Sequence, residues 1–251
     1  MDKMLPNNTF YDELAADYDE MISFDSAVGK KKTLLKSFVI AEMKSAADIG
    51  CGSGVDSIAL ASLGLKVTAF DPSTEMLKVA KANTDKMSVK IEFYNYSADN
   101  IPEDFNNQFD LVVSLGNTFA NIPKEKFLAS LQRCYEILRP KGQLLIQVLN
   151  YEKILADKRR VVSITEGNDK YFIRFYDFIG EQIVFNILTF SKSNTSDFKL
   201  TSTRIHPHQS EDFISGFQAL GFNHISHYGD LNLSDFIPAQ SKDLIIKAVK
   251  N

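Results

Sequence analysis

The sequence predicts an α/β fold: a doubly wound, mostly parallel sheet of seven strands with an antiparallel β insertion after the fifth strand. Three observations support this prediction. Short apolar stretches alternate with helix-like stretches between residues 44 and 150, a rhythm that is typical of parallel sheets. A glycine-rich turn joins the first strand to its helix. After Asn150 the chain changes to closely spaced strands joined by short turns, which is typical of an antiparallel meander.

The elements up to Asn150 follow from the spacing of apolar residues. Residues 9–43 are expected to be helical, because apolar side chains recur three and four positions apart. The next helices are expected at Val55–Leu63, Ser73–Ala82, where Ser73 is a natural N-cap, and Lys124–Leu138. The five strands are expected at Ala46–Ile49, Lys66–Phe70, Val89–Phe93, Phe109–Ser114 and Gln143–Leu149.

The chain beyond Asn150 is expected to form an insertion and then to complete the main sheet. The inserted strands are expected at Tyr171–Ile179, Ile183–Phe190 and Asp197–Ile205. A helix at Ser210–Leu220 and strands at Asn223–Tyr228 and Asp243–Lys250 follow. We therefore expect N-terminal helices in residues 1–43 that close over the site, an α/β domain in residues 44–150 and 206–251, and an inserted antiparallel β lid in residues 151–205.

Composition limits the classes of function. The chain has 251 residues, of which 44% are apolar and 24% charged, as in an ordinary globular protein. The net charge of −4 makes a nucleic-acid partner unlikely. No apolar run approaches the roughly 20 residues of a membrane helix, so we expect no membrane partner. The polar N-terminus and the two widely separated cysteines predict a cytoplasmic protein without disulfides.

The turn after the first strand carries the strongest chemical signal. Gly50, Gly52 and Gly54 permit a tight turn and a close approach of the backbone to a ligand, and the following helix offers free N–H groups. Asp71, 21 residues after Gly50 at the end of the second strand, is placed to accept hydrogen bonds from ribose hydroxyls. Together they predict a nucleotide-type ligand. The dinucleotide fingerprint would require a third glycine at Val55, and no Walker loop follows.

These residues resemble class I S-adenosylmethionine-dependent methyltransferases, and within that class the glycine/sarcosine N-methyltransferase group. The resemblance runs from about residue 10 to the end of the chain. It implies a Rossmann-like methyltransferase fold, S-adenosyl-L-methionine as cofactor and S-adenosyl-L-homocysteine as its product. The stretches that carry it are Asp48–Leu60, Val67–Leu77, Phe109–Ile122, Asn150–Leu155 and Tyr228–Asp230.

The resemblance also implies roles for single residues. Asn117 and Tyr18 would contact the reacting groups, and one of Lys30, Lys31 or Lys32 would hold the methionine carboxylate of the cofactor. The cofactor-binding residues implied are Tyr11, Tyr18, Asp48, Gly50, Gly52, Gly54, Asp71, Pro72, Ser97, Ala98, Asp99, Leu115 and Asn117.

The expected substrate pocket departs from the family at Leu149. Glycine-methylating enzymes have an arginine there, which pairs with the substrate carboxylate, and an aliphatic side chain cannot replace it. Glycine is therefore not the expected acceptor. Arg174 or Arg204 could supply another anionic contact, or either could be an outward-facing charge. The residues predicted to line the pocket are Leu149, Arg174, Tyr176, His206 and His208, with core packing as the alternative for the last three.

The reaction implied is the transfer of a methyl group to a small-molecule acceptor by in-line displacement, in which the protein aligns the reactants. The resemblance favours nitrogen as the acceptor atom. A neutral amine needs no base for the transfer, whereas a hydroxyl group would. Methylation of oxygen is the alternative. A non-catalytic protein that binds S-adenosylmethionine or S-adenosylhomocysteine and a nicotinamide oxidoreductase are further hypotheses. The histidine pairs lack the spacing of zinc sites, so no metal is expected. The acceptor and the oligomeric state stay open.

Overall fold

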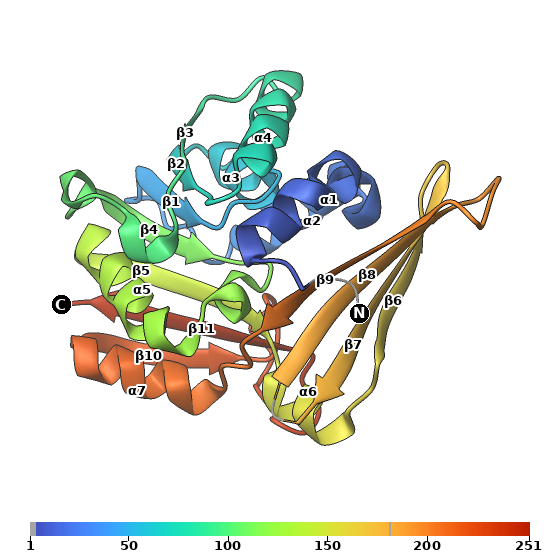
Figure 1. Cartoon of the computed structure of the whole chain (residues 1–251). Helices are drawn as coiled ribbons and strands as arrows, with labels where there is room; N and C mark the ends of the chain where they lie inside the picture. Colours follow the sequence, from blue (N-terminus) through green and yellow to red (C-terminus); the bar gives the residue numbers. More distant parts are fainter. Residues whose placement is uncertain (1–3, 181) are drawn as a thin grey trace.

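The computed structural model describes residues 4–180 and 182–251, so residues 1–3 of the expected N-terminal part and residue 181, in an expected turn, lie outside it. Its main sheet has seven strands in the order β10-β11-β5-β4-β1-β2-β3 (Figure 1). Only β11 runs antiparallel to its neighbours, which confirms the predicted sheet. The strands are β1 Ser45–Ile49, β2 Lys66–Phe70, β3 Ile91–Tyr94, β4 Phe109–Ser114, β5 Leu138–Leu149, β10 Phe222–Tyr228 and β11 Asp243–Lys250.

Helices cover both faces of this sheet, which explains why its central strands β1 and β4 are almost entirely buried and mostly apolar. Successive residues of β1 point to opposite faces, so Ala46 and Ala47 enter different hydrophobic clusters and both are fully buried. Ser73 caps α4 as predicted, since its side chain accepts a hydrogen bond from the Met76 N–H at 3.1 Å. The helices of this part are α3 Val55–Ala61, α4 Thr74–Lys86, α5 Lys124–Ile137 and α7 Ser210–Leu220, with 3₁₀ turns η1 Ala98–Asn100, η2 Glu103–Phe105 and η3 Thr118–Asn121.

The N-terminal segment forms two helices rather than the continuous helical stretch expected over residues 9–43. α1 (Asn7–Ile22) and α2 (Phe24–Leu35) meet at Ser23, which has a left-handed backbone with φ of 56°. The Ser23 N–H bonds the carbonyl of Glu20, and this contact ends α1. Apolar spacing alone did not reveal the break, because both helices carry the same periodicity on either side of it.

The insertion is an antiparallel sheet, as predicted, but it has four strands in the order β6-β7-β8-β9. Three of them, β7 (Lys170–Ile179), β8 (Gln182–Ser191) and β9 (Phe198–Ile205), match the predicted strands. The edge strand β6 (Val161–Glu166) and the helix α6 (Tyr151–Asp157) were not predicted. Only one side of an edge strand is paired, and the residues of β6 are largely exposed, so its burial pattern is weak.

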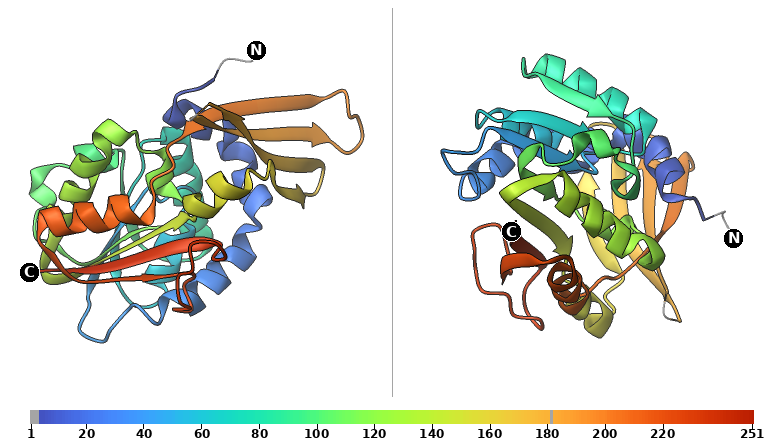
Figure 2. Two further views of the ribbon diagram at one scale, coloured as in Figure 1. Left: turned by 90° about the horizontal axis from the view of Figure 1, so that it is seen from below. Right: turned by 90° about the vertical axis from the view of Figure 1, so that its left-hand side faces the viewer.

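Helix α1 lies between the two sheets (Figure 1). Its buried residue Phe10 packs in one cluster with Phe172 and Ile187 of the inserted sheet. On its other side, Asp12 of α1 accepts a hydrogen bond from the Ser73 hydroxyl at 2.6 Å. The inserted sheet projects away from the α/β body in the left view of Figure 2, and α1 contacts both parts.

Candidate active site

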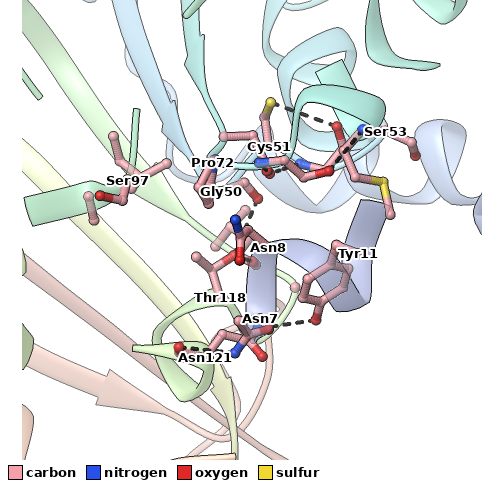
Figure 3. Close-up of a pocket in the computed structure, with 18 of the residues that line it drawn as sticks. Asn7, Asn8, Tyr11, Gly50, Cys51, Ser53, Pro72, Ser97, Thr118 and Asn121 are labelled. Atoms are coloured by element: carbon pink, nitrogen blue, oxygen red, sulfur yellow. Dashed lines mark hydrogen bonds between the residues drawn. The ribbon is translucent and has the colours of Figure 1, made fainter. Parts of the chain in front are cut away.

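A cavity of about 770 Å³ lies at the carboxyl ends of β1, β2 and β4, where doubly wound sheets bind their ligands. The turn after β1 lines it with Gly50–Ser53, and the tip of β2 adds Asp71. Helix α1 covers the opposite side with Tyr11 and Tyr18. Figure 3 draws residues of α1, including Tyr11, across from the turn. The cavity is therefore enclosed between the α/β domain and the N-terminal helix.

The backbone of the turn requires glycine. Gly50, Gly52 and Gly54 all have positive φ, at 72°, 53° and 91°. A side chain at Gly50 would collide with Thr118, since a Cβ there would lie 2.2 Å from the Thr118 Cγ2 atom. A Cβ at Gly52 would meet no protein atom within 4 Å, and Gly52 lines the cavity. The missing side chain at Gly52 thus keeps space open in the cavity, whereas at Gly50 it allows the neighbouring Thr118 to pack closely.

The Asp71 carboxylate joins the turn to the second strand. One oxygen accepts a hydrogen bond from the Gly52 N–H and the other from the Ser73 N–H, both at 2.8 Å. The side chain is buried, and burial raises its pKa to about 6. A buried carboxylate with free lone pairs at the cavity wall is a strong acceptor for hydroxyl groups of a ligand.

A second group of charges borders the cavity from α2. Lys31 forms an ion pair of 2.9 Å with Asp56, and both residues line the cavity. Asp48 lies beneath the turn and accepts a 2.5 Å hydrogen bond from the Ser57 hydroxyl. Burial, reinforced by the carboxylate of Asp56, raises the pKa of Asp48. Of the three lysines considered from the sequence, Lys31 is the one that lines the cavity.

The two tyrosines of α1 present neutral phenols to the site. The Tyr11 hydroxyl accepts a hydrogen bond from the Asn121 amide at 3.1 Å. Burial raises the pKa of Tyr11 well above its ordinary value and that of Tyr18 to about 12. Both side chains stay protonated near neutral pH and can act as hydrogen-bond donors but not as bases.

A smaller cavity of about 230 Å³ adjoins the first. Four residues line both: Tyr11, Tyr18, Gly116 and Arg174. The other walls are mostly apolar and come from α1, β5 and the inserted sheet: Leu14, Met21, Leu149, Val162, Phe185, Ile187 and Ile205. The two cavities are therefore neighbours that share part of their walls.

A chain of hydrogen bonds borders the smaller cavity. The Asn117 Oδ1 atom accepts from the Leu149 N–H at 2.9 Å, and its Nδ2 donates to the Tyr151 hydroxyl at 2.8 Å. Tyr151 in turn hydrogen-bonds to Tyr176, whose pKa burial raises to about 12. Asn117 is thereby fixed in a left-handed conformation, φ 71°, at the end of β4. Tyr151 was not singled out from the sequence, and only its place in the Asn150–Leu155 stretch pointed to it.

The structure brings most of the predicted site residues together. Leu149, Arg174 and Tyr176 line the smaller cavity together with Asn117. Gly54 does not line the larger cavity, and a Cβ at this position would lie 3.4 Å from the Cβ of Ala80 in α4. The predicted cofactor residues that do line it are Tyr11, Tyr18, Gly50, Gly52, Asp71, Pro72, Ser97, Ala98, Asp99 and Leu115.

Three of the other candidates lie elsewhere. His206 and His208 line neither cavity. His208 is buried against the Phe127 ring at 4.2 Å, and its Nε2 atom contacts the Ile122 carbonyl at 2.8 Å, so its side chain packs in the core. Burial lowers the pKa of both histidines. Arg204 is exposed on β9.

Two further observations concern residues 4–180 and 182–251. They contain no cluster of three His, Cys, Asp or Glu side chains that could hold a metal ion. No helix within them is long and apolar enough to cross a membrane.

Residues 46–142 match the model of a protein family described as methyltransferase domain. The chain carries a methyltransferase domain. The match begins in β1 and includes the glycine turn, Asp71 and Asn117. The match supports the predicted methyltransferase class over residues 46–142, and it does not distinguish the glycine/sarcosine N-methyltransferase group within that class.

Curated proteins are similar to the methyltransferase domain over part of their length. Over 103 residues the chain is 33% identical to the ubiquinone biosynthesis O-methyltransferase of Xanthomonas campestris pv. campestris (strain B100), covering 41% of this chain and 42% of that protein. Over 123 residues it is 32% identical to the glycine N-methyltransferase of Homo sapiens, covering 43% and 42%. The chain thus matches less than half the length of these relatives.

The fold similarity extends beyond the methyltransferase domain. An S-adenosylmethionine-dependent methyltransferase from Clostridium acetobutylicum ATCC 824 covers 96% of this chain and 99% of its own, with a TM-score of 0.77 and 15% identity. This likeness shows that the N-terminal helices and the insertion belong to one known fold, which confirms the predicted Rossmann-like methyltransferase architecture.

Proposed function

We propose that the protein is an S-adenosylmethionine-dependent methyltransferase that methylates nitrogen in a small molecule. The observation that carries the proposal is the junction of the two cavities at Tyr11, Tyr18, Gly116 and Arg174. The larger cavity has the glycine turn and Asp71 of a nucleoside-binding site. The smaller one gives an acceptor direct access to a group held there.

The larger cavity fits S-adenosylmethionine in size and chemistry. Its volume lies within the roughly 300–1,000 Å³ typical of small-molecule and cofactor sites. Among the described residues, four that line it have a buried side-chain oxygen without a hydrogen-bond partner: Asn7, Ser53, Asp56 and Asn121. Only the oxygen of Asp56 is in an ion pair, with Lys31. Buried polar atoms rarely stay unpaired, so they indicate a polar ligand.

Individual residues have separate tasks in this proposal. Gly50 and Gly52 pack against the methionine part, Asp71 accepts hydrogen bonds from the ribose hydroxyls, and Ser97–Asp99 border the adenine. Lys31 lines the cavity beside Asp56 and pairs with the methionine carboxylate, which requires it to share its charge with Asp56. These assignments extend the family resemblance to the residues that line the cavity.

Catalysis rests on alignment and on exclusion of water. When bound, S-adenosylmethionine supplies an activated methyl group on a sulfonium for in-line displacement. Asn117, held by Leu149 and Tyr151, and Tyr18 of α1 hold the acceptor against the larger cavity. Orientation of bound reactants contributes roughly 7–11 kcal/mol to lowering such barriers. Helix α1 keeps water out because it closes the junction from the side opposite the sheet.

Two observations favour nitrogen over oxygen as the acceptor atom. No aspartate, glutamate or histidine lines the smaller cavity in the part of the chain described, so no side chain there can deprotonate a hydroxyl. The Arg174 guanidinium disfavours a second positive charge nearby and so favours the neutral, nucleophilic form of an amine. Oxygen methylation is the alternative, since both kinds of enzyme are among the relatives.

Net charge and the state of the cysteines support proposals about the substrate class and the cell compartment. Its net charge of −4 argues against a nucleic-acid substrate. Cys51 and Cys134 are both buried and unpaired, as expected in the reducing cytoplasm, where we place the protein.

Calorimetry with S-adenosylhomocysteine and with NAD⁺, followed by transfer of labelled methyl groups to a panel of amines and hydroxy compounds, tests the proposal. We expect the protein to bind S-adenosylhomocysteine but not NAD⁺. We also expect the labelled methyl group on a nitrogen atom of the acceptor. Tight binding without transfer to any acceptor would support a non-catalytic binding protein instead, and binding of NAD⁺ alone an oxidoreductase.

The variant Asp71→Asn has a matched control in Asp110→Asn. Asp110 also accepts two backbone hydrogen bonds, from Lys44 and Ser45 at 2.8 and 2.9 Å, but it lies at the amino end of β4, away from the cavity. Both variants should lose stability, and only Asp71→Asn should weaken S-adenosylhomocysteine binding. Equal binding by both variants would contradict the role given to Asp71.

A further inference from the structure

Arg174 is the basic residue of the smaller cavity, and its charge has no acidic partner. It lies on β7, and its Nε atom donates a 2.7 Å hydrogen bond to the Ser163 hydroxyl of β6. Within residues 4–180 and 182–251 its guanidinium forms no ion pair with a carboxylate, whereas Lys31 is paired with Asp56. The terminal nitrogens of Arg174 are therefore free to bind an anion.

The hydrogen bond to Ser163 fixes the direction in which the Arg174 guanidinium points. Ser163 and Arg174 are paired residues of neighbouring strands, so their side chains leave the same face of the inserted sheet. Arg174 is half-buried and lines both cavities, so this is the face that covers the site. A guanidinium held in this way is a rigid donor of paired hydrogen bonds.

The smaller cavity is suited to an anionic ligand. It is lined by apolar side chains, neutral phenols and the amides of Asn117 and Gln147, and by no acidic side chain among the described residues. A desolvated positive charge without a partner is unfavourable, and a ligand carboxylate would remove that cost. One guanidinium matches one carboxylate, and the volume of about 230 Å³ limits the ligand to a small metabolite.

We propose that Arg174 is the specificity-determining residue for the methyl acceptor, and that the acceptor is a small molecule with a carboxylate and an apolar body. This inference rests on the proposed function. Leu149, on β5, lines the same cavity and contacts the apolar body. The carboxylate is thus recognised from the inserted sheet, and not from the end of β5.

The test compares acids with their primary amides on protein saturated with S-adenosylhomocysteine. Anthranilate with 2-aminobenzamide and leucine with leucinamide are suitable pairs, and calorimetry measures their affinity. We expect the acids to bind more tightly than the amides, by roughly 10- to 100-fold given the strength of charge-assisted hydrogen bonds. Arg174→Gln should abolish this preference, and Arg174→Lys, which keeps the charge without the paired donors, should retain part of it.

Arg204→Gln is the matched control, because Arg204 lies on the neighbouring strand β9 but is exposed and lines neither cavity. It should leave the preference for acids unchanged. Equal affinity of the wild type for acids and amides, including no binding of either, would overturn the inference. A loss of S-adenosylhomocysteine binding in Arg174→Gln would also overturn it, since Arg174 would then serve the cofactor. Failure of the proposed function itself is distinguishable, because S-adenosylhomocysteine would not bind the wild type.

Discussion

Replacing Gly52 by alanine gives the sharpest test of the larger cavity. Gly52 has φ of 53°, and a Cβ there would meet no protein atom within 4 Å. Without ligand, the only cost of Gly52→Ala is that alanine must adopt the left-handed backbone conformation. This lowers the free energy of unfolding by about 1–2 kcal/mol. For a chain of this length such a loss lowers Tm by roughly 2–8 °C.

The expected effect on ligand binding is separate from this loss of stability. The new methyl group would project into the space where the ligand backbone approaches the turn. Overpacking by one methyl group typically costs about 1–3 kcal/mol, which weakens S-adenosylhomocysteine binding roughly 5- to 150-fold.

Gly180→Ala is the control for this variant. Gly180, in the turn between β7 and β8, has φ of 60° and equally open surroundings, but it lines neither cavity. Thermal unfolding should show similar losses for both variants, and calorimetry should show weaker binding only for Gly52→Ala. Unchanged affinity in Gly52→Ala would refute the assignment of the turn to the ligand.

Three further predictions follow from the same site. Burial raises the pKa of Asp71 to about 6, and ribose hydroxyls donate best to the ionised carboxylate. S-adenosylhomocysteine affinity measured by calorimetry should therefore be constant above about pH 7 and fall by up to tenfold per pH unit below about pH 6; a flat profile would argue against a ribose contact. Tyr151→Phe removes the hydroxyl that accepts from Asn117 and should cost about 1–3 kcal/mol in urea unfolding, with slower methyl transfer but unchanged S-adenosylhomocysteine affinity. Burial raises the pKa of the thiols of Cys51 in the turn and Cys134 in α5, so iodoacetamide should alkylate both far more slowly than a free thiol, as mass spectrometry can measure. Rapid labelling of Cys51 in the native protein would show that the turn opens.

Much of the fold was predictable because its signals are local. Alternating strands and helices, the Ser73 N-cap and the spacing from Gly50 to Asp71 involve residues close in sequence. Each of these features depends on backbone conformation and on the periodicity of apolar residues, which neighbouring residues determine. The same information could not locate the break at Ser23, because amphipathic helices on both sides of a one-residue turn share one apolar pattern.

The inserted sheet was less predictable for a related reason. The strand β6 is at an edge, with Ile164 67% exposed, so burial does not impose a clear alternation on its residues. The short helix α6 depends on its cap, in which Asn150 accepts from the Lys153 N–H at 3.3 Å, and seven residues carry little periodicity.

By itself the sequence determined the class of the protein and predicted the turn and the acid that line the larger cavity. Gly50–Gly54 and Asp71 directly follow two strands, β1 and β2, whose parallel pairing brings their carboxyl ends together. Tertiary structure alone decided the other half. In the tertiary structure Lys31 lines the larger cavity, and Asn117 is hydrogen-bonded to Tyr151. His208 is buried in the core, and Arg174 lines both cavities. These residues are as far apart in the sequence as α2 and the segment between β9 and α7. Long-range packing, which no local pattern encodes, determines which of their side chains meet.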